Sequence, residues 1–293
     1  MASLSLHLTI VAPFQDYAFM RRALVACFAL SIGSGPIGVL LLLRRMSLVG
    51  DAMSHAVLPG AAVGFLVAGL SLWGMTTGGF VAGLIVAMLA GAVSRNTALR
   101  EDASFAGFYL ASLALGVLLV STHGSNIDLL HILFGTILAV DNTALYLVGG
   151  IASVSTLVLL TIYRPLVLEC FDPGFLRAVG GRGSIYHLVF LVLVVLNLVA
   201  GFQALGTLMA VGLMMLPAAA SRFWANEVWT MALVAIAVGF LSGFLGLVAS
   251  YRFGLPSGPA IVLAASLFYV ASILVGRRNG LVRQHWPARH LAT

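Results

Sequence analysis

Asp51 and His55 are the residues of this sequence whose types and spacing point most directly to chemistry. They lie in the segment RRMSLVGDAMSHAVLPG at 44–60, and a separation of four residues places both side chains on one face of a helix. A carboxylate and an imidazole together form a chelating pair for a divalent metal ion. Two ligands are too few for a tight site, so we expect a second copy of the chain, related by a two-fold axis, to complete a set of four.

Both residues also have simpler interpretations, which the sequence leaves open. Asp51 is a suitable N-cap for a helix that begins there, and His55 fits a core histidine that is hydrogen-bonded to a neighbouring helix. An acid inside a membrane helix costs roughly 3 kcal/mol on insertion scales, so such acids are normally paired or functional. This cost argues against the simpler interpretations. Pro59 has no N–H, so it leaves the carbonyl of His55 without its helical donor and free to face an ion.

The composition of the chain predicts that this pair lies in a membrane protein. Of the 293 residues, 61% are hydrophobic and only 8% are charged, and the mean hydropathy is +1.10. So little charge cannot cover a soluble surface, whereas apolar runs long enough to cross a bilayer recur along the chain. We therefore expect an all-α, polytopic bundle that forms one domain over residues 1–293, with no nucleic-acid partner.

The apolar runs predict nine membrane spans, or eight if one of them is re-entrant. The segment 14–20 precedes them as an amphipathic lead-in at the membrane interface. The spans are expected at 21–43, 52–70, 78–94, 104–121, 143–165, 185–203, 205–221, 228–249 and 258–276.

The arginines set the orientation of these spans. All 15 basic residues are arginines, and with the N-terminus outside, only Arg21, Arg22 and Arg252 lie on the outer side. The other twelve lie inside, as the positive-inside rule requires. The helix that carries Asp51 then starts from the cytoplasmic side, so the site must lie deeper than the loop edge, or the entry must be re-entrant.

The outer connection at 122–142 contains acids and histidines but no arginine. It holds His123, Asp128, His131 and Asp141. An acidic, histidine-bearing outer surface favours cations over anions. The simpler interpretation is a solvated loop in which Asp141 caps the next helix.

The inner connection at 171–184, FDPGFLRAVGGRGS, predicts a short helix of about two turns. Asp172 fits the N-cap, Pro173 the first helical position and Gly180 the C-terminal stop. With Arg177, this segment is either an ordinary loop helix or a docking element for a cytoplasmic partner, and the sequence favours neither.

Several other patterns argue against an enzyme. Without lysine the chain cannot form a P-loop, so an ATPase that drives transport must be a separate subunit, and no hydrolase motif is present. Cys27 and Cys170 lie in different environments, so we expect no disulfide, and no cleaved signal peptide is expected. In the segment GTLMAVGLMMLPAAAS at 206–221, the residues Met209, Met214 and Met215 are packing residues or soft ligands.

Four segments together resemble the metal-ion permease family of ABC importers, which handle zinc, manganese and iron. They are RRMSLVGDAMSHAVLPG, LFGTILAVDNTAL, FDPGFLRAVG and GTLMAVGLMMLPAAAS, in that order along nearly the whole chain. The resemblance implies that Asp51 and His55 coordinate a transported ion. It also implies that Asp172, Pro173, Arg177 and Gly180 belong to the segment that meets the ATPase.

The resemblance further implies the partners and the location. They are cytoplasmic ABC ATPase subunits, an extracytoplasmic metal-binding protein and a second permease, most simply in a homodimer. The location is the bacterial inner membrane, and no permanent cofactor is expected. Two other functions stay open: a proton-coupled secondary carrier in which the pair relays protons, and an ABC permease for a metal chelate. A non-transport scaffold is the weakest alternative, since it gives no reason for an intramembrane acid.

Overall fold

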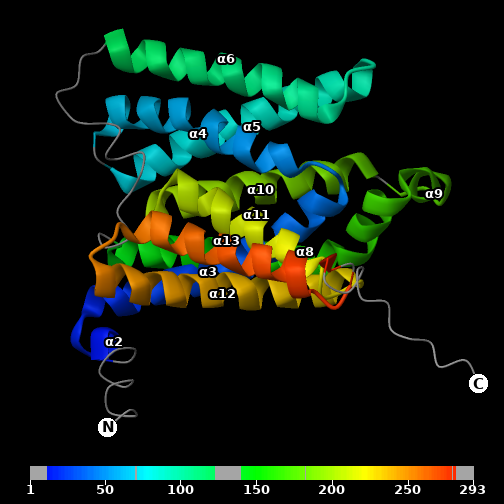
Figure 1. The fold of residues 1–293 in the computed structure, drawn as a ribbon. Helices are drawn as coiled ribbons and strands as arrows, with labels where there is room; N and C mark the ends of the chain where they lie inside the picture. Colours follow the sequence, from blue (N-terminus) through cyan, green and yellow to red (C-terminus); the bar gives the residue numbers. More distant parts are fainter. Residues whose placement is uncertain (1–11, 70, 123–139, 182, 279, 282–293) are drawn as a thin grey trace, which may run out of the picture.

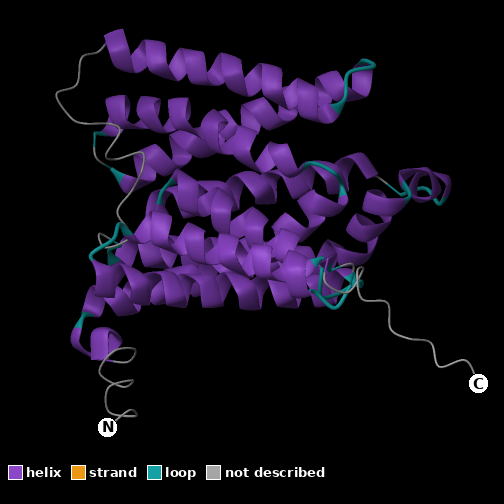
Figure 2. Cartoon of the chain, in the orientation of Figure 1, coloured by secondary structure: helices purple, strands orange, loops and turns teal. Residues whose placement is uncertain are grey.

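The computed structural model describes residues 12–69, 71–122, 140–181, 183–278 and 280–281. Within those ranges all regular structure is helical (Figure 2). The helices are α2 (Ala12–Asp16), α3 (Ala18–Leu43), α4 (Ser47–Ala68), α5 (Leu72–Asn96), α6 (Glu101–Thr122), α8 (Asn142–Phe171), α9 (Pro173–Ala178), α10 (Gly183–Leu205), α11 (Thr207–Ser221), α12 (Val228–Phe253) and α13 (Ser257–Val275).

The long helices run side by side between two ends of the bundle (Figure 1). In the described part of the chain, 8 helices are long and apolar enough to cross a membrane. The apolar helix α11 runs alongside them but has only 15 residues. The short α9 lies at one end of the bundle, and α2 lies at the other. The predicted membrane bundle of eight to nine helices is therefore confirmed, with α11 as the short ninth helix.

The arginines of the described residues lie near these two ends of the bundle. Arg44, Arg100 and Arg222 flank helix ends on the same side as α9, whereas Arg21 and Arg252 lie in turns of α3 and α12 at the opposite side. The positive-inside rule therefore assigns the α9 end to the cytoplasm.

The centre of the bundle is formed by α3 and α10, which are the most buried of the long helices. Asn197 of α10 ties them to α8, because its amide nitrogen donates to the Ser155 hydroxyl at 2.7 Å. Its amide oxygen fills the space that a side chain on Gly33 of α3 would occupy. This buried hydrogen bond confirms the kind of helix-to-helix contact expected of polar residues in membrane spans.

A seam of glycines joins α4 to α5. Gly60 and Gly64 of α4 lie against the backbone carbonyls of Gly78 and Gly74 on α5, so that a Cβ added at either α4 position would overlap a carbonyl oxygen. Small residues at spacings of four allow membrane helices to pack backbone against backbone. The seam fixes the position of α4, and α6 packs against the same two helices (Figure 1).

The predicted span boundaries differ most from the helices at three places. The helix α4 begins at Ser47 rather than at 52, α5 begins at Leu72 rather than at 78, and α8 continues to Phe171 rather than ending at 165. Pro165 lies inside α8, because a membrane helix tolerates proline when neighbouring groups satisfy the freed carbonyl. The predicted lead-in at 14–20 is divided, since α2 ends at Asp16 and α3 begins at Ala18.

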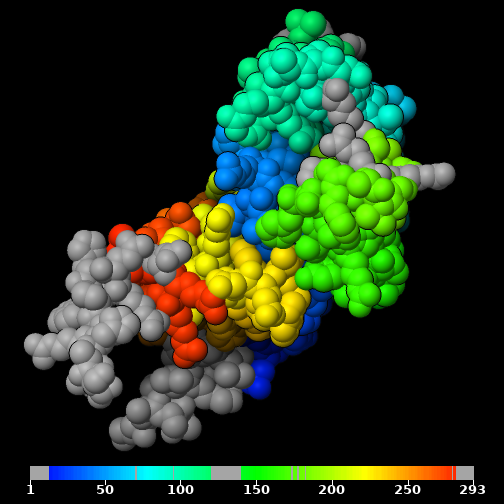
Figure 3. Space-filling view, turned by 90° about the vertical axis from the view of Figure 1, so that its right-hand side faces the viewer, coloured from blue at the N-terminus to red at the C-terminus, as the bar shows by residue number. Residues whose placement is uncertain are grey.

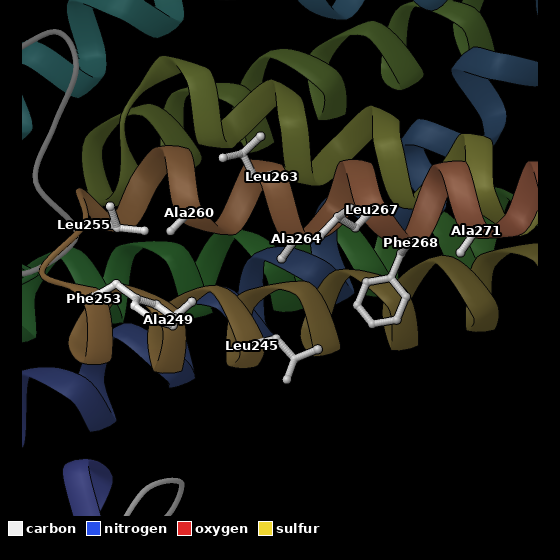
Figure 4. A pocket seen from close by; sticks show the side chains of 10 residues that line it. All are labelled: Leu245, Ala249, Phe253, Leu255, Ala260, Leu263, Ala264, Leu267, Phe268 and Ala271. Carbon is white, nitrogen blue, oxygen red and sulfur yellow. The ribbon is translucent and has the colours of Figure 1, made fainter.

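A groove of about 500 Å³ between α12 and α13 has an entirely apolar lining (Figure 4). It offers neither a metal ligand nor a polar anchor, and its chemistry suits hydrocarbon. The lining residues are Leu245, Ala249, Phe253, Leu255, Ala260, Leu263, Ala264, Leu267, Phe268 and Ala271.

The glycine seam makes a direct stability prediction. Gly60→Ala forces α4 and α5 apart, and overpacking of this kind costs about 1–3 kcal/mol, so the thermal unfolding midpoint of the purified protein in detergent should fall. Gly107→Ala on α6 is the matched control, because nothing lies within 4 Å of a Cβ added there. Equal midpoints for the two variants would show that the seam is not tightly packed.

Candidate functional site

Asp51 and His55 lie in the first half of α4, near the end of the bundle that holds α9. They are the fifth and ninth residues of a helix that begins at Ser47, and thus lie about 6 and 12 Å along its axis. The N-cap of α4 is Met46, so the interpretation of Asp51 as an N-cap is wrong. Because α4 is one continuous helix, the pair lies one to two turns inside the helix rather than in a re-entrant loop.

The two side chains face each other across one turn and are open to the outside of the single chain. His55 Nε2 lies 3.8 Å from Asp51 Oδ1, and the side chains are 40% and 64% exposed. Metal–ligand bonds of about 2.1 Å would place two such atoms about 3.0–3.4 Å apart, so a small rotation brings both onto one ion. The structure thus brings the predicted pair together, on an accessible face.

One copy of the chain supplies only part of a metal site at this position. Within the described ranges no three His, Cys, Asp or Glu side chains gather in a way that could hold an ion. Ser54 does not add a ligand, because its hydroxyl donates to the backbone carbonyl of Asp51 at 2.7 Å. The pair therefore needs ligands from water, from another polypeptide or from a second copy.

Helix α6 packs against α4 beside the pair. The ring of Tyr109 stacks on the His55 imidazole with centroids 6.0 Å apart and planes 29° from parallel. One residue further along α4, the carbonyl of Ala56 accepts a hydrogen bond from the Ser112 hydroxyl at 3.2 Å. Gly116 then lies against Pro59. These contacts pack α6 against the part of α4 that carries His55.

The second nitrogen of His55 explains why such a site would bind an ion weakly. His55 Nδ1 is buried and has no hydrogen-bond partner among the described residues, so the interpretation of His55 as a satisfied core histidine is wrong. A metal-binding histidine normally donates its second ring N–H to an acceptor, and loss of that acceptor costs 10–100-fold in affinity. A weak site suits a transported ion, which must leave as well as enter.

The methionines of α11 divide into two groups. Met209 and Met214 are buried in the core, which confirms the packing interpretation for those two. Met215 is only partly buried, and its sulfur lies against Gly50 of α4, next to Asp51. Of the three thioethers, Met215 is therefore the one closest in position to the candidate site.

The predicted inner helix is present as α9 (Pro173–Ala178), with Arg177 in its last turn. The Asp172 carboxylate accepts from the Phe175 amide at 2.8 Å, which confirms Asp172 as the N-cap and Pro173 as the first helical residue. Gly180 has a φ of +80°, the left-handed conformation in which helices commonly end. The local prediction for this segment is thus confirmed.

Most of the predicted outer connection at 122–142 lies outside the described residues. His123, Asp128 and His131 lie outside the described residues. Asp141 is the N-cap of α8 and accepts from the Ala144 amide at 2.7 Å, so its simpler interpretation is confirmed.

A partly buried polar cluster at the α9 end has no predictive pattern in the sequence. Arg44 at the C-cap of α3 contacts His187 of α10 and Cys170 of α8, and His187 contacts Glu101 of α6. These residues are far apart in the sequence and lie near the ends of apolar runs. Both cysteines are free, as expected.

Several known proteins are similar to this chain in sequence, and a solved structure is similar in fold. ScaB, the manganese import system permease protein of Streptococcus parasanguinis, is 36% identical over 265 residues, which are 90% of this chain and 93% of ScaB. YfeD, the chelated iron transport system membrane protein of Yersinia pestis, is 32% identical over 262 residues, or 89% of this chain and 86% of YfeD. The structure of PsaBC from Streptococcus pneumoniae in complex with Fab matches with a TM-score of 0.82 and 31% identity, covering 94% of this chain and 99% of that one.

The model of the ABC 3 transport family matches residues 16–276. The chain belongs to this family and is a multi-pass membrane protein.

The N-cap of α9 allows a test of how firmly that segment is held. Asp172→Ala removes the acceptor of the Phe175 amide, at a typical cost of about 1 kcal/mol to the helix, so amide hydrogen exchange over 173–178 should accelerate severalfold. Asp172→Asn retains an acceptor and should keep most of the protection. Equal exchange in Asp172→Ala and the wild-type protein would contradict the capping role.

Proposed function

We propose that this chain is the permease of an ABC importer that carries a divalent metal ion past Asp51 and His55, with manganese as the first candidate. One observation carries the proposal: an accessible carboxylate–imidazole pair, 3.8 Å apart, lies on an apolar helix of an ABC 3 family chain. Two relatives support manganese and iron as the transported metals, since ScaB belongs to a manganese import system and YfeD to a chelated iron transport system. Oxygen and nitrogen ligands suit both ions. Zinc stays a sequence prediction.

The exposure of the pair supports a homodimer. Asp51 is 64% exposed on a membrane-spanning helix, and an acid that faced lipid there would be strongly unfavourable. A second copy that brings its own Asp51 and His55 across a two-fold axis would cover both acids and supply four ligands. Seen from the α9 end, the space-filling view shows the blue residues around the α3–α4 connection at the surface, between the cyan α6 region and the yellow residues around α11 (Figure 3).

The energy source would be a separate ATPase that docks at α9. The sequence has no lysine and hence no P-loop. The helix α9 projects from the bundle at the end where the arginines gather (Figure 1). The N-cap Asp172 and the left-handed Gly180 define where α9 begins and ends, as a docking element requires. The permease itself would then carry no catalytic site and no permanent cofactor.

The direction of transport implies two further features. An extracytoplasmic metal-binding protein would deliver the ion at the outer end of the bundle, and the chain would lie in the bacterial inner membrane. The ATPase would then alternate access to the pair from the two sides of the membrane.

The central test removes the two ligands singly. Asp51→Ala and His55→Ala should each lower manganese uptake by cells at least tenfold, because either change leaves too few donors to compensate the ion for its lost water. Ser54→Ala is the matched control on the same helix, since it removes only a hydrogen bond within α4.

Three outcomes of the uptake measurement would redirect the proposal. Normal uptake in both ligand variants, with the protein present in the membrane, would contradict the site. Uptake that persists without the ATPase and collapses with an uncoupler would support a proton-coupled carrier. Competition by a ferric chelate but not by free manganese or iron ions would support a chelate permease.

The proposed dimer seam allows a cross-linking test. Leu48 lies one turn before Asp51 and is 68% exposed. In a chain whose two cysteines are replaced, Leu48→Cys should form covalent dimers with a short bis-maleimide in membranes. Leu267→Cys is the control, because Leu267 is 70% exposed but lies in the apolar groove of α12 and α13. Dimers from Leu267→Cys alone would place the seam elsewhere.

A further inference from the structure

Four polar side chains join the α9 ends of four helices. They are Arg44, Glu101, Cys170 and His187, which we name the Arg44 cluster. Arg44 Nε donates to Cys170 Sγ at 3.0 Å, and Arg44 Nη1 lies 2.7 Å from His187 Nδ1. His187 Nε2 lies 2.9 Å from Glu101 Oε1. The guanidinium also lies over the ring of Phe190, 4.8 Å from its centroid.

The chemistry of these contacts fixes their direction. A guanidinium has only donors, so His187 Nδ1 must accept the bond from Arg44. The proton of the neutral imidazole is then on Nε2, which is the atom that faces the Glu101 carboxylate. A doubly protonated ring would set an N–H against the guanidinium. The buried histidine therefore joins the guanidinium on α3 to the carboxylate on α6.

The cluster is directly connected to α9. Cys170 lies two residues before Asp172, the N-cap of α9, within the last turn of α8. The neighbouring carboxylate of Glu169 lies against Gly183, the first residue of α10, where the positive end of the helix dipole attracts it. A displacement of α9 must therefore move the end of α8 that Arg44 holds.

The cluster is also directly connected to Asp51 and His55. Only Arg45 and Met46 separate Arg44 from α4, and they form a tight connection rather than a loose loop. Arg45 has a φ of +59°, and the Met46 amide donates to the Leu41 carbonyl at 2.9 Å, as in a Schellman motif. A shift of Arg44 therefore carries the start of α4 with it.

Helix α6 provides the second connection. Its first residue is Glu101 of the cluster, and two turns later Tyr109 stacks on His55. Because α6 packs against α4 and α5 and is the least buried of the long helices, its position depends strongly on how its first residue is held. The cluster thus reaches the candidate metal site through α4 and through α6.

We propose that Arg44 is the positioning residue that transmits the movement of α9 to the Asp51–His55 pair. The inference rests on the proposed function, since it assigns to α9 the contact with the ATPase. Arg44 does not touch the ion. It keeps the end of α8 and the beginnings of α4 and α6 moving together, so that ATP hydrolysis changes the access to the pair.

The test measures the coupling between ATP hydrolysis and transport. The full chain is reconstituted in liposomes with its ATPase and binding protein, and both ATP hydrolysis and Mn²⁺ uptake are measured. Arg44→Gln should retain at least half of the hydrolysis rate, whereas the Mn²⁺ transported per ATP should fall at least tenfold. Arg45→Gln removes the same charge one residue further along, at an exposed position, and should leave the ratio unchanged.

A second variant guards against a simple loss of folding. Glu101→Met keeps the approximate size of the side chain but offers no oxygen to His187, so it should also lower the ratio of uptake to hydrolysis, while Cys170→Ser, which can still accept from Arg44, should preserve it. An unchanged ratio in Arg44→Gln and Glu101→Met would overturn the role of the cluster, as would hydrolysis and uptake that fall in proportion. ATP-independent behaviour of the wild-type chain would instead overturn the proposed function, and with it this inference.

Discussion

A carboxylate on a membrane-spanning helix cannot be left facing hydrocarbon, and this constraint governs the structure. Asp51 is largely exposed on the surface of the single chain, and its ion-pair contact within the described residues is with His55. The free energy of such an acid becomes acceptable when water, an ion or another polypeptide covers it. The fold therefore requires something outside this chain at that face of α4. A second copy and a hydrated path between two copies satisfy the requirement together.

The surrounding helices hold the pair in place while leaving it open. The glycine seam brings the backbones of α4 and α5 into contact, and α6 places a tyrosine ring against the imidazole. Under the proposed function, the unpartnered Nδ1 of His55 would keep the affinity of the pair for an ion modest. Rigid placement combined with modest affinity is what a transit site needs, because an ion bound as tightly as in a structural site would not be released on the timescale of transport.

Much of this architecture is predictable from the sequence, because the length and hydropathy of a membrane span can be recognised within a single stretch of residues. The apolar runs predicted the long helices and the short α11, and Asp172, Pro173 and Gly180 predicted α9. The start of α4 is not predictable in the same way. Gly50 and Asp51 resemble a helix start, but α3 ends in a Schellman motif at Arg45, and the next helix begins directly after it.

The buried contacts between distant residues lie beyond sequence patterns. Arg44 and His187 are 143 residues apart, and each lies near the end of an apolar run. Their pairing depends on how α3 and α10 meet at the centre of the bundle, which no local signal encodes. The same is true of the stacking of Tyr109 on His55. Residue types therefore identify the candidate ligands, whereas only packing reveals what positions them.

The most direct measurement of the central claim is pulsed electron paramagnetic resonance of Mn²⁺ bound to the purified permease in lipid nanodiscs. If Asp51 and His55 hold the ion, the spectrum should show coupling to imidazole nitrogen, and the coupling should change with ¹⁵N-histidine labelling and vanish in His55→Ala. Bound Mn²⁺ without nitrogen coupling, or with the same coupling in His55→Ala, would contradict the account.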